Sequence, residues 1–319
     1  MAEADNTLAG LVQMNDQNLA DIDVTDLLQD APLLAKLTAV PASQGGTVHK
    51  YLKQTVAAGA AFRAVNTGLL NASAQEELVT VTCKYLDGSF FRDVAIADGY
   101  KDGRAAYMAK ETAKALKSMY AGLEKQILQG VDSDANGFVG APGYSFVDQL
   151  TDGMVVNTAS GAGGRSCWLV RSTEDDVAVV AGNDGSLSMD MDLDTVMRIL
   201  TDTNGTGYNA INAALAGWYA MQFGSAYSLG RIVNLDSTTN NTLTDALLSE
   251  AISKFPATRQ PNLIVMDRVL LQELQASRTA TNPTGQPAPF PQDAFGIEIV
   301  ITDQLGTGES AMTTTTTTS

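Results

Sequence analysis

Residues 132–137, DSDANG, have the spacing of the first half of a calcium-binding loop. Asp132, Asp134 and Asn136 occupy every second position before a glycine, so three side-chain oxygens could reach one cation. The twelfth position of such a loop should be a bidentate Glu, but counting from Asp132 it is Gly143. This glycine and the proline before it predict a turn where the exiting helix should begin. The three residues remain a calcium candidate, but the stretch fails as an EF-hand and we predict no metal site.

Histidine chemistry is limited by number, because His49 is the only histidine in the chain. A Ser-His-Asp or Cys-His unit would have to use this residue, and zinc or iron sites built from several histidines are excluded. His49 lies in TVHKYLKQT, whose polar-apolar alternation predicts a strand with the imidazole at an exposed position. We therefore predict no catalytic residues, and expect a protein that is not an enzyme and needs no cofactor.

Thiol and phosphate-binding chemistry are not indicated either. Cys83 and Cys167 lie far apart and in no metal-binding or redox spacing, which favours two reduced, buried thiols. The chain contains no G-x-x-x-x-G-K-[ST] loop, and the glycines of SGAGGRS lack the dinucleotide-binding spacing. The sequence thus predicts no nucleotide site.

Acidic residues dominate the composition, with 36 Asp and Glu against 20 Lys and Arg and a formal net charge of -16. Such a surface repels phosphate backbones, which argues against sequence-specific nucleic-acid binding. The 319 residues and 45% hydrophobic content suffice for one large folded domain or two smaller ones. The start of the chain lacks the basic and apolar regions of a secretory signal, and no apolar run is long enough to span a bilayer. We therefore expect no membrane partner.

The first part of the chain predicts an arm followed by a hairpin. Residues 1–44 are polar, with one short helical stretch at 25–37 whose leucines need another surface to pack on. Over residues 45–99, VHKYLKQT and LVTVTCKYL alternate in polarity, which predicts two strands joined by a long tip. Such a hairpin cannot bury a core by itself and needs a partner surface.

A long amphipathic helix is predicted over residues 104–129, with Gly130 as its C-terminal stop. At 1.5 Å per residue it would be about 39 Å long. Its stripe residues recur at spacings of three and four and predict core packing. They are Met108, Thr112, Leu116, Met119, Leu123 and Ile127.

The rest of the chain predicts alternating strands and helices, as in an α+β or α/β domain. Strands are expected at CWLVRS, DVAVVAG, LIVM and GIEIVITD, and helices at LDTVMRILTD, DALLSEAISKF and, starting at Asp267, DRVLLQELQASR. A Pro-rich loop at 281–292 and a threonine-rich tail complete the chain.

In this order, these segments resemble the major capsid protein of tailed double-stranded DNA bacteriophages, which has the Hong Kong 97-type (Johnson) fold. The resemblance covers residues 25–305 and rests on order, spacing and short local matches. GGTVHKYLKQ, AFRAVNTGLL and LVTVTCKYLDGSFFRDVAIAD resemble the family's extended loop and return strand. AAYMAKETAKALKSMYAGLEKQILQG resembles the spine helix, and NGFVGAP the turn after it. SCWLVRSTEDDVAVVAGNDGS and AYSLGRIVNLD resemble axial-domain strands, and PNLIVMDRVLLQELQ with GIEIVITDQL the closing strand-helix-strand.

The resemblance implies an α+β fold of this type, divided into six segments. They are an N-terminal arm at 1–44, an extended β-hairpin loop and return strand at 45–99, a peripheral domain with the spine helix at 100–150, an axial domain at 151–290, the closing strand of the peripheral domain at 291–305 and a low-complexity tail at 306–319.

The resemblance also implies self-assembly through pentamers and hexamers into an icosahedral head around double-stranded DNA. The protein would be made in the host bacterial cytoplasm and located in the virion, with scaffolding, portal and decoration proteins as further partners. The leader is shorter than the scaffolding segment of some relatives, so any scaffolding protein would be separate. Some relatives crosslink a lysine of the loop; Lys50 and Lys53 lie in that region, but we expect no crosslink.

Seven residues in or near the loop are candidates for contacts between subunits. The basic ones could pair with a neighbour's carboxylates, although an exposed solvated charge worth about 0–1 kcal/mol explains any one of them equally well. The apolar ones could anchor the interface, because an exposed apolar tip is a liability on a monomer. The candidates are Lys50, Lys53, Arg63 and Arg92, and Phe62, Leu69 and Leu70.

Three alternatives stay open at the level of sequence. An encapsulin-like nanocompartment shell would share the fold but hold enzyme cargo instead of DNA. A calcium-binding surface or adhesion protein would explain the acidity and DSDANG, but lacks the twelfth ligand and a signal peptide. A soluble enzyme is disfavoured, because no set of chemical residues points to a reaction.

Overall fold

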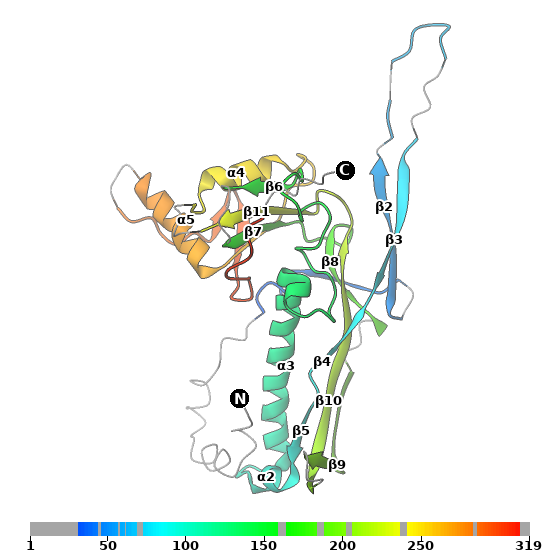
Figure 1. The fold of residues 1–319 in the computed structure, drawn as a ribbon, viewed down its shortest axis with the longest axis vertical. Helices are drawn as coiled ribbons and strands as arrows, with labels where there is room; N and C mark the ends of the chain where they lie inside the picture. The colour runs from blue at the N-terminus through cyan, green and yellow to red at the C-terminus, as the bar shows by residue number, and fades with distance from the viewer. Residues whose placement is uncertain are drawn as a thin grey trace. The chain divides into compact units, whose positions relative to one another are not determined.

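The structure of the chain is a computed structural model (Figure 1). It describes residues 31–43, 46–56, 58–60, 62–68, 73–158, 164–183, 188–201, 206–236, 241–282 and 286–312. The chain forms two compact units, whose boundary falls within helix α3 (Arg104–Gln129) and within strand β10 (Thr206–Phe223). Unit 1 includes Tyr85–Glu124 and Ser186–Gly217, and unit 2 includes Pro32–Lys84, Lys125–Gly185 and Trp218–Ser319. None of the described helices has the length and apolar character needed to cross a lipid bilayer.

The predicted hairpin is formed by β2 (Val48–Val56) and β3 (Gln75–Thr82), which pair antiparallel as a separate two-stranded sheet (Figure 1). Successive side chains of a strand point to opposite sides, so the alternating sequence gives the hairpin two distinct faces. Leu52 lies directly opposite Leu78, and both are exposed. Val79, on the other face, is partly covered.

Helix α3 begins and ends where the sequence predicts, and Gly130 follows it with a φ of 59°. Glycine adopts this left-handed conformation without strain, which explains its place after the last helical residue. The short helix α2 (Val94–Gly99) precedes α3 and begins at Asp93, whose side chain accepts a hydrogen bond from Ala95 N. The core of unit 1 joins both helices to β10 and includes Ile96, Ala97, Tyr100, Tyr107, Met108, Ile211 and Ala213.

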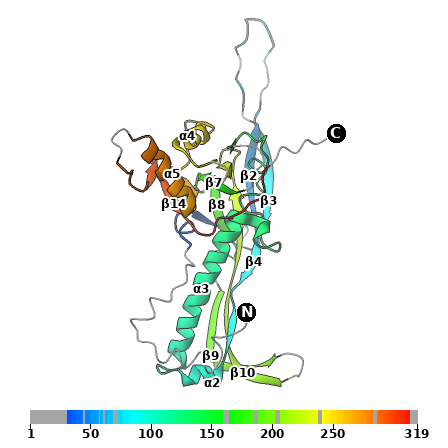
Figure 2. The same ribbon diagram turned by 60° about the vertical axis from the view of Figure 1, so that its left-hand side comes forward.

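The strands of unit 1 are organised by β10 (Figure 2). β4 (Lys84–Asp87), β5 (Phe90–Asp93) and β9 (Ser188–Thr201) all pair with it. The helix predicted at LDTVMRILTD is wrong, because this segment belongs to β9, which pairs antiparallel along β10. The stretch MDMDLD, residues 189–194, overlaps the start of this segment, and its apolar and acidic residues alternate with a period of two. Strand β10 supplies the backbone hydrogen-bond partners that a strand requires.

In unit 2, the C-terminal part of β10 pairs with β8 (Val177–Ala181), and β8 pairs in parallel with β1 (Thr38–Pro41). β8 is buried along almost its whole length, as its apolar run DVAVVAG predicts. Cys83 is buried in this core beside Val180.

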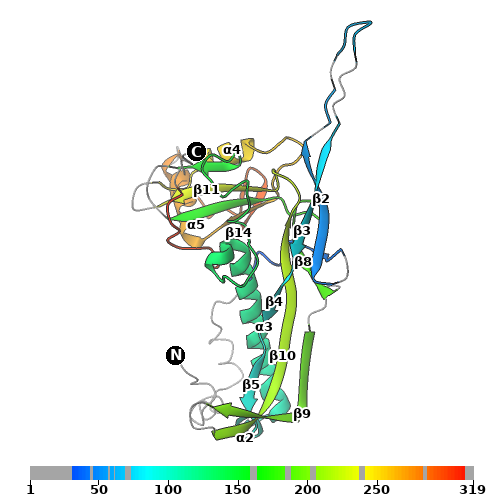
Figure 3. The ribbon, with the colours of Figure 1, turned by 45° about the vertical axis from the view of Figure 1, so that its right-hand side comes forward.

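A second sheet in unit 2 has the strand order β13-β14-β12-β7-β11-β6. Two of its strands, β11 and β14, are labelled in Figure 3. Its strands are β6 (Val155–Asn157), β7 (Arg165–Val170), β11 (Leu229–Leu235), β12 (Leu263–Met266), β13 (Asp293–Ala294) and β14 (Ile297–Ile301). Helix α4 (Asp245–Ser253) packs against β6, β11 and α5 (Arg268–Ala280). The predicted strands and both of these helices are confirmed, and Asp267 caps α5 by accepting a hydrogen bond from Leu270 N.

Two segments differ in detail from the sequence reading. β14, which the sequence assigned to the domain of the long helix, pairs in parallel with β12 and so shares a sheet with strands assigned to the axial domain. The short helical stretch predicted at 25–37 lies partly outside the described residues. Its described end is a turn in which Leu37 N donates to Leu33 O at 3.0 Å, with Leu33 fully buried.

Candidate inter-subunit interface

His49, predicted at an exposed position, is buried, with 7% of its surface accessible. Ser43 N donates to Nδ1 at 3.1 Å, and Gln222 Oε1 lies 2.7 Å from Nε2. Because Nδ1 accepts a hydrogen bond, the ring proton lies on Nε2, which donates to Gln222. The prediction of exposure was wrong because alternation identifies two faces of a strand but not the face that the rest of the unit covers.

Two more residues on the same face of β2 fix the root of the hairpin. Tyr51 Oη donates to Phe223 O at 3.0 Å, and burial raises the pKa of this phenol. Lys53 Nζ lies 5.1 Å from the ring centre of Tyr144 and 4.4 Å from that of Phe146, a cation–π arrangement. Burial in this setting lowers the pKa of the Lys53 ammonium.

The aromatic residues that β2 contacts are themselves held in place by neighbouring residues. Tyr144 stacks on Phe223 with ring centres 4.4 Å apart, and its hydroxyl donates to Ser225 O at 2.8 Å. We call His49, Tyr51 and Lys53 the root residues. They tie alternate positions of β2 to the end of β10 and to the segment after α3, so the base of the hairpin is held on one side.

The opposite side, the outer face of the hairpin, carries exposed apolar side chains. Leu52 and Leu78 are 65% and 58% exposed, and Phe62 in the tip is fully exposed at 109%. Val65, also in the tip, is exposed to 88%. Exposed apolar groups gathered on a projecting element are typical of a surface that another chain covers. The sequence did not predict Leu52 and Leu78 as contact residues. A signal was present, because Leu52 is an apolar residue between polar Lys50 and Gln54 on the polar face of the strand.

The remaining predicted contact residues in the hairpin are placed differently. Lys50 is exposed on the outer face, two positions from Leu52. Arg63 is exposed, but its NH1 group donates to Thr67 O at 2.8 Å within the tip. Leu69 and Leu70 lie outside the described residues. Whether any of these residues contacts a neighbour stays a prediction.

Arg92 is paired within its own subunit, in unit 1. Its Nε and NH2 groups donate to Glu111 Oε2 at 3.0 and 2.7 Å, and Lys114 Nζ donates to Oε1 at 3.0 Å. Burial of Glu111 would raise its pKa, but the hydrogen bonds and charges of Lys114 and Arg92 outweigh burial and hold the pKa below its usual value. The guanidinium therefore joins β5 to α3, and the interface role predicted for it stays a prediction.

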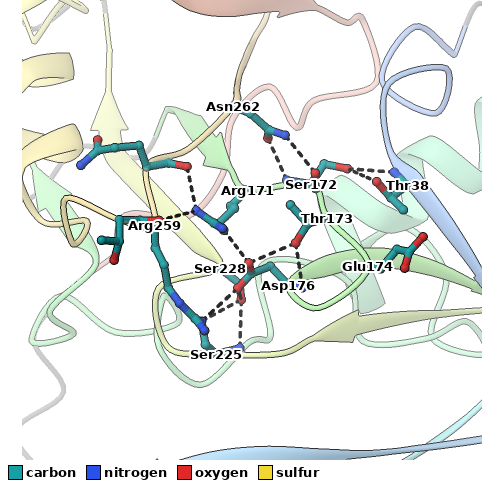
Figure 4. A network of polar contacts seen from close by, with 12 residues as sticks. Thr38, Arg171, Ser172, Thr173, Glu174, Asp176, Ser225, Ser228, Arg259 and Asn262 are labelled. Carbon is teal, nitrogen blue, oxygen red and sulfur yellow. Dashed lines mark hydrogen bonds and ion pairs between the residues drawn. The ribbon is translucent and has the colours of Figure 1, made fainter.

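A polar network centred on Asp176 joins the β7–β8 turn, the β10–β11 turn and the loop before β12 (Figure 4). Arg171 Nε donates to Asp176 Oδ2 at 2.5 Å, and Ser228 Oγ donates to Oδ1 at 2.9 Å. Ser225 Oγ donates to Oδ1 at 3.1 Å, and Arg259 NH1 lies 3.6 Å from the same oxygen. The carboxylate is 2% exposed. Burial alone would raise its pKa, but these hydrogen bonds and the Arg171 charge hold it below its usual value.

The network extends to the first strand of unit 2 (Figure 4). Ser172 N donates to Asn262 Oδ1 at 2.8 Å, and Asn262 Nδ2 donates to Ser172 O at 2.9 Å. Thr38 N donates to Ser172 Oγ at 2.8 Å. One cluster thus connects the sheet of β1 and β8 with the sheet of β7 and β12, and nothing in the local sequence around Asp176 signals it.

The C-terminal segment is fastened to the second sheet. Arg231, which is buried with its guanidinium over the Trp168 ring at 4.6 Å, donates from NH2 to Glu309 Oε2 at 2.8 Å. Three residues on, Asn234 Oδ1 accepts from Met312 N at 3.0 Å, and its Nδ2 donates to Met312 O at 3.1 Å. Residues 309–312 are therefore held by one buried charge pair and one side-chain amide that imitates a strand partner.

The calcium candidate lies in a turn after α3. Asp134 Oδ1 accepts a hydrogen bond from Asn136 N at 2.9 Å, which forms an Asx turn. Gln126 Nε2 donates to the carbonyls of Asp134 and Phe138 at 3.2 and 2.7 Å. A Cβ at Gly137 would lie 2.3 Å from that Nε2 atom. Within the described part of the chain, no group of three or more His, Cys, Asp or Glu side chains is placed to hold a metal ion. Closure of the turn accounts for the Asp, Asn and Gly spacing.

The fold resembles those of phage capsid shells. A structure of bacteriophage Epsilon15 matches with a TM-score of 0.67 at 18% identity, covering 98% of this chain and 99% of that one. The capsid of bacteriophage JBD30 matches with a TM-score of 0.53 at 10% identity, covering 93% and 99%. The JBD30 capsid decorated with minor capsid protein trimers gives 0.54 at 12% identity, covering 94% and 99%. The chain therefore has the Hong Kong 97-type capsid fold, as predicted.

Residues 16–311 match the family model of the major capsid protein GP7. The chain belongs to this family, and it is a structural protein of the capsid shell. The resemblance to major capsid proteins of tailed phages is thereby confirmed. No curated protein sequence matches the chain.

Proposed function

We propose that copies of this chain assemble through pentamers and hexamers into an icosahedral head that encloses double-stranded DNA. The observation that carries the proposal is the hairpin, whose root is held by buried contacts while its outer face and tip expose apolar side chains. An element of this kind orders chain without burying apolar surface of its own subunit, which is costly unless a neighbour covers it.

The outer face is the part of the hairpin on which we place the inter-subunit contact. Leu52 and Leu78 form one cross-strand pair, and Phe62 lies in the tip. Burying such a side chain contributes about 1.5–3 kcal/mol, so three of them could supply several kcal/mol to each contact. Lys50 lies on the same face and could pair with a carboxylate of the neighbour, as could Arg63.

We also propose that the division of the chain follows the family plan. We propose that residues 1–44 act as an arm, 45–99 as the extended loop and 100–150 as the peripheral domain. Residues 151–290 would form the axial domain, and 291–305 the closing strand of the peripheral domain. The closing strand pairs with β12, which supports a tight connection between the last two parts.

The acidic balance suits a container for DNA. A formal charge of -16 repels phosphate backbones, so packaged DNA would not adhere to the shell through sequence-specific contacts. Scaffolding, portal and decoration proteins are proposed as further partners, and the JBD30 capsid is one that carries minor capsid protein trimers. Synthesis would take place in the host bacterial cytoplasm.

The test is assembly of a Leu52→Lys variant, with Val131→Lys as the matched control, because Val131 is an exposed apolar residue outside the hairpin. Light scattering after size exclusion measures particle mass, and the absorbance ratio measures nucleic acid. We expect Val131→Lys and the parent chain to form particles, and Leu52→Lys to remain as folded subunits or capsomers. Normal particles of Leu52→Lys would overturn the interface, and natively produced particles holding protein cargo without DNA would indicate a nanocompartment.

A further inference from the structure

One edge of the hairpin presents backbone groups that another strand could bind. β2 and β3 form a sheet of two strands, so each strand has one outer edge. Cys83 N donates to Thr47 O at 2.8 Å, directly across the hairpin. Because bonded and non-bonded pairs alternate along an antiparallel ladder, the N–H and C=O groups of Glu76, Leu78 and Thr80 point away from β2. Within the described part of the chain these groups have no hydrogen-bond partner.

The outer edge of β2 differs, because the segment before the hairpin covers part of it. Lys50 N points away from β3 and donates to Ser43 Oγ at 2.7 Å. Ser43 N donates in turn to His49 Nδ1, which fixes this segment beside the strand. The edge of β2 is therefore closed at its root, whereas that of β3 is open over residues 76–80.

The sequence of β3 does little to protect this edge. Proteins commonly protect an exposed edge with charged residues, proline or a bulge. Glu76 and Glu77 supply charge at one end, but residues 78–82, LVTVT, contain no charge and no proline. Four of these five residues are β-branched, which favours strand pairing. An open edge of this kind is typical of a strand that pairs with a strand of another chain.

We propose that β3 pairs antiparallel with β3 of a second copy of this chain, about a two-fold axis at Leu78. The inference rests on the proposed function, in which copies of the chain contact one another. Leu78 would lie opposite the partner's Leu78, and Glu76 opposite the partner's Thr80, so that each opposed pair exchanges two backbone hydrogen bonds. Neighbours within a ring meet head to tail, whereas a two-fold contact is self-complementary. The pairing would therefore join subunits of neighbouring capsomers.

The side chains of the hairpin favour a second copy as the partner. Leu52 and Leu78 are opposed and exposed on the outer face, so the pairing would join the leucines of both copies into one apolar row across four strands. Lys50 and the partner's Glu76 would lie on either side of Thr80, two strands and about 10 Å apart, within reach of an ion pair. The acidic residues of β3 would face uncharged residues of the partner strand, which avoids repulsion between like charges.

The test is disulfide formation by a Leu78→Cys variant of the full-length chain at its assembly concentration. Opposed residues of a bonded pair have Cα atoms about 5.5 Å apart, which is within disulfide range. The geometric control is Leu52→Cys, exposed on the same face but three strand spacings, about 14 Å, from its counterpart. Cys83 and Cys167 are buried thiols, and the parent chain is the blank. With oxidised glutathione we expect about tenfold more linked dimer from Leu78→Cys than from Leu52→Cys.

A mixture of Glu76→Cys and Thr80→Cys chains tests the register. The pairing places these two positions opposite each other, so mass spectrometry should find the disulfide-linked peptides. Thr80→Cys alone should give little dimer, because its two copies would lie about 13 Å apart along the strands.

The outcomes separate the edge pairing from the shell. Absence of the Leu78→Cys dimer, or equal dimer from Leu52→Cys, would overturn the pairing, and particles formed by the parent chain would then leave the proposed function standing. Leu78→Cys dimers without particles would support the pairing while the shell proposal fails.

Discussion

Replacing Asp176 by Asn should destabilise unit 2 strongly, because this side chain neutralises two guanidinium groups at the junction of both sheets. Asn keeps the shape but removes the charge that Arg171 at 2.5 Å and Arg259 at 3.6 Å face. Removing one partner of a buried pair costs about 3–5 kcal/mol. Arg171 can still reach the carbonyl oxygens of Thr258 and Gln260, at 3.5 and 3.4 Å, so we expect a loss near the lower limit, about 3 kcal/mol.

The assay is urea unfolding of dissociated subunits, followed by tryptophan fluorescence, to which the fully buried Trp168 in β7 and the half-buried Trp218 in β10 contribute. With a slope of about 3 kcal/mol per molar urea, the midpoint should fall by about 1 M. The matched control is Asp175→Asn, because Asp175 is the exposed neighbour in the same turn. A midpoint shift for Asp176→Asn no larger than that of the control would refute the reasoning.

The same variant predicts a pH dependence. The pKa of Asp176 is held below its usual value in the folded state, so its contribution is present above the unfolded pKa of about 3.9. This contribution is lost as the pH falls through the folded pKa. The difference in unfolding free energy between the parent and Asp176→Asn should therefore be full at pH 7 and shrink below about pH 4. A difference that is constant down to pH 3 would contradict the assigned charge role.

Three further substitutions test other contacts. Glu309→Ala leaves the buried Arg231 guanidinium without its carboxylate and should lower the free energy of unfolding by about 3 kcal/mol, measured by thermal melting of subunits. The control is Glu298→Ala, which breaks an exposed ion pair with Lys36 and should change the stability little. Gly140→Ala forces a side chain onto a backbone with a φ of 64° and 2.5 Å from a carbonyl oxygen, so soluble yield should fall sharply, unlike that of Gly153→Ala, where no atom lies within 4 Å. His49→Ala removes two hydrogen bonds and should increase hydrogen exchange in β2 by about tenfold, whereas a flat exchange profile would refute the root contacts.

Much of the fold was predictable because its signals are local. The helix over residues 104–129 combines a stripe at spacings of three and four with a glycine stop, and its bounds agree with the structure. α5 was predicted with its cap, because Asp267 precedes an amphipathic run and can bind the exposed N–H groups of the first turn. The helix predicted at 193–202 was wrong because the apolar spacing there favours a helix, whereas the alternation before it favours a strand. Pairing with the long strand β10 makes the segment a strand.

The interface was predictable only in outline. The alternating segments and their long tip indicated a hairpin that needs a partner, and Phe62 was identified as an exposed tip residue. The two lysines of β2 illustrate the limit. Lys50 and Lys53 read alike in the sequence, yet one is exposed on the outer face and the other lies over two aromatic rings of its own subunit.

The sequence by itself determined the long helix and most strands, because short-range periodicity carries that information, and the order of these segments carried the resemblance to major capsid proteins. Only the tertiary structure decided that His49 is buried, that Arg92 is paired with Glu111 and that Asp176 joins two sheets. These outcomes depend on residues up to 173 positions apart, as between His49 and Gln222. Local patterns specify which face a side chain takes, but burial and pairing are set by which distant segment packs against that face.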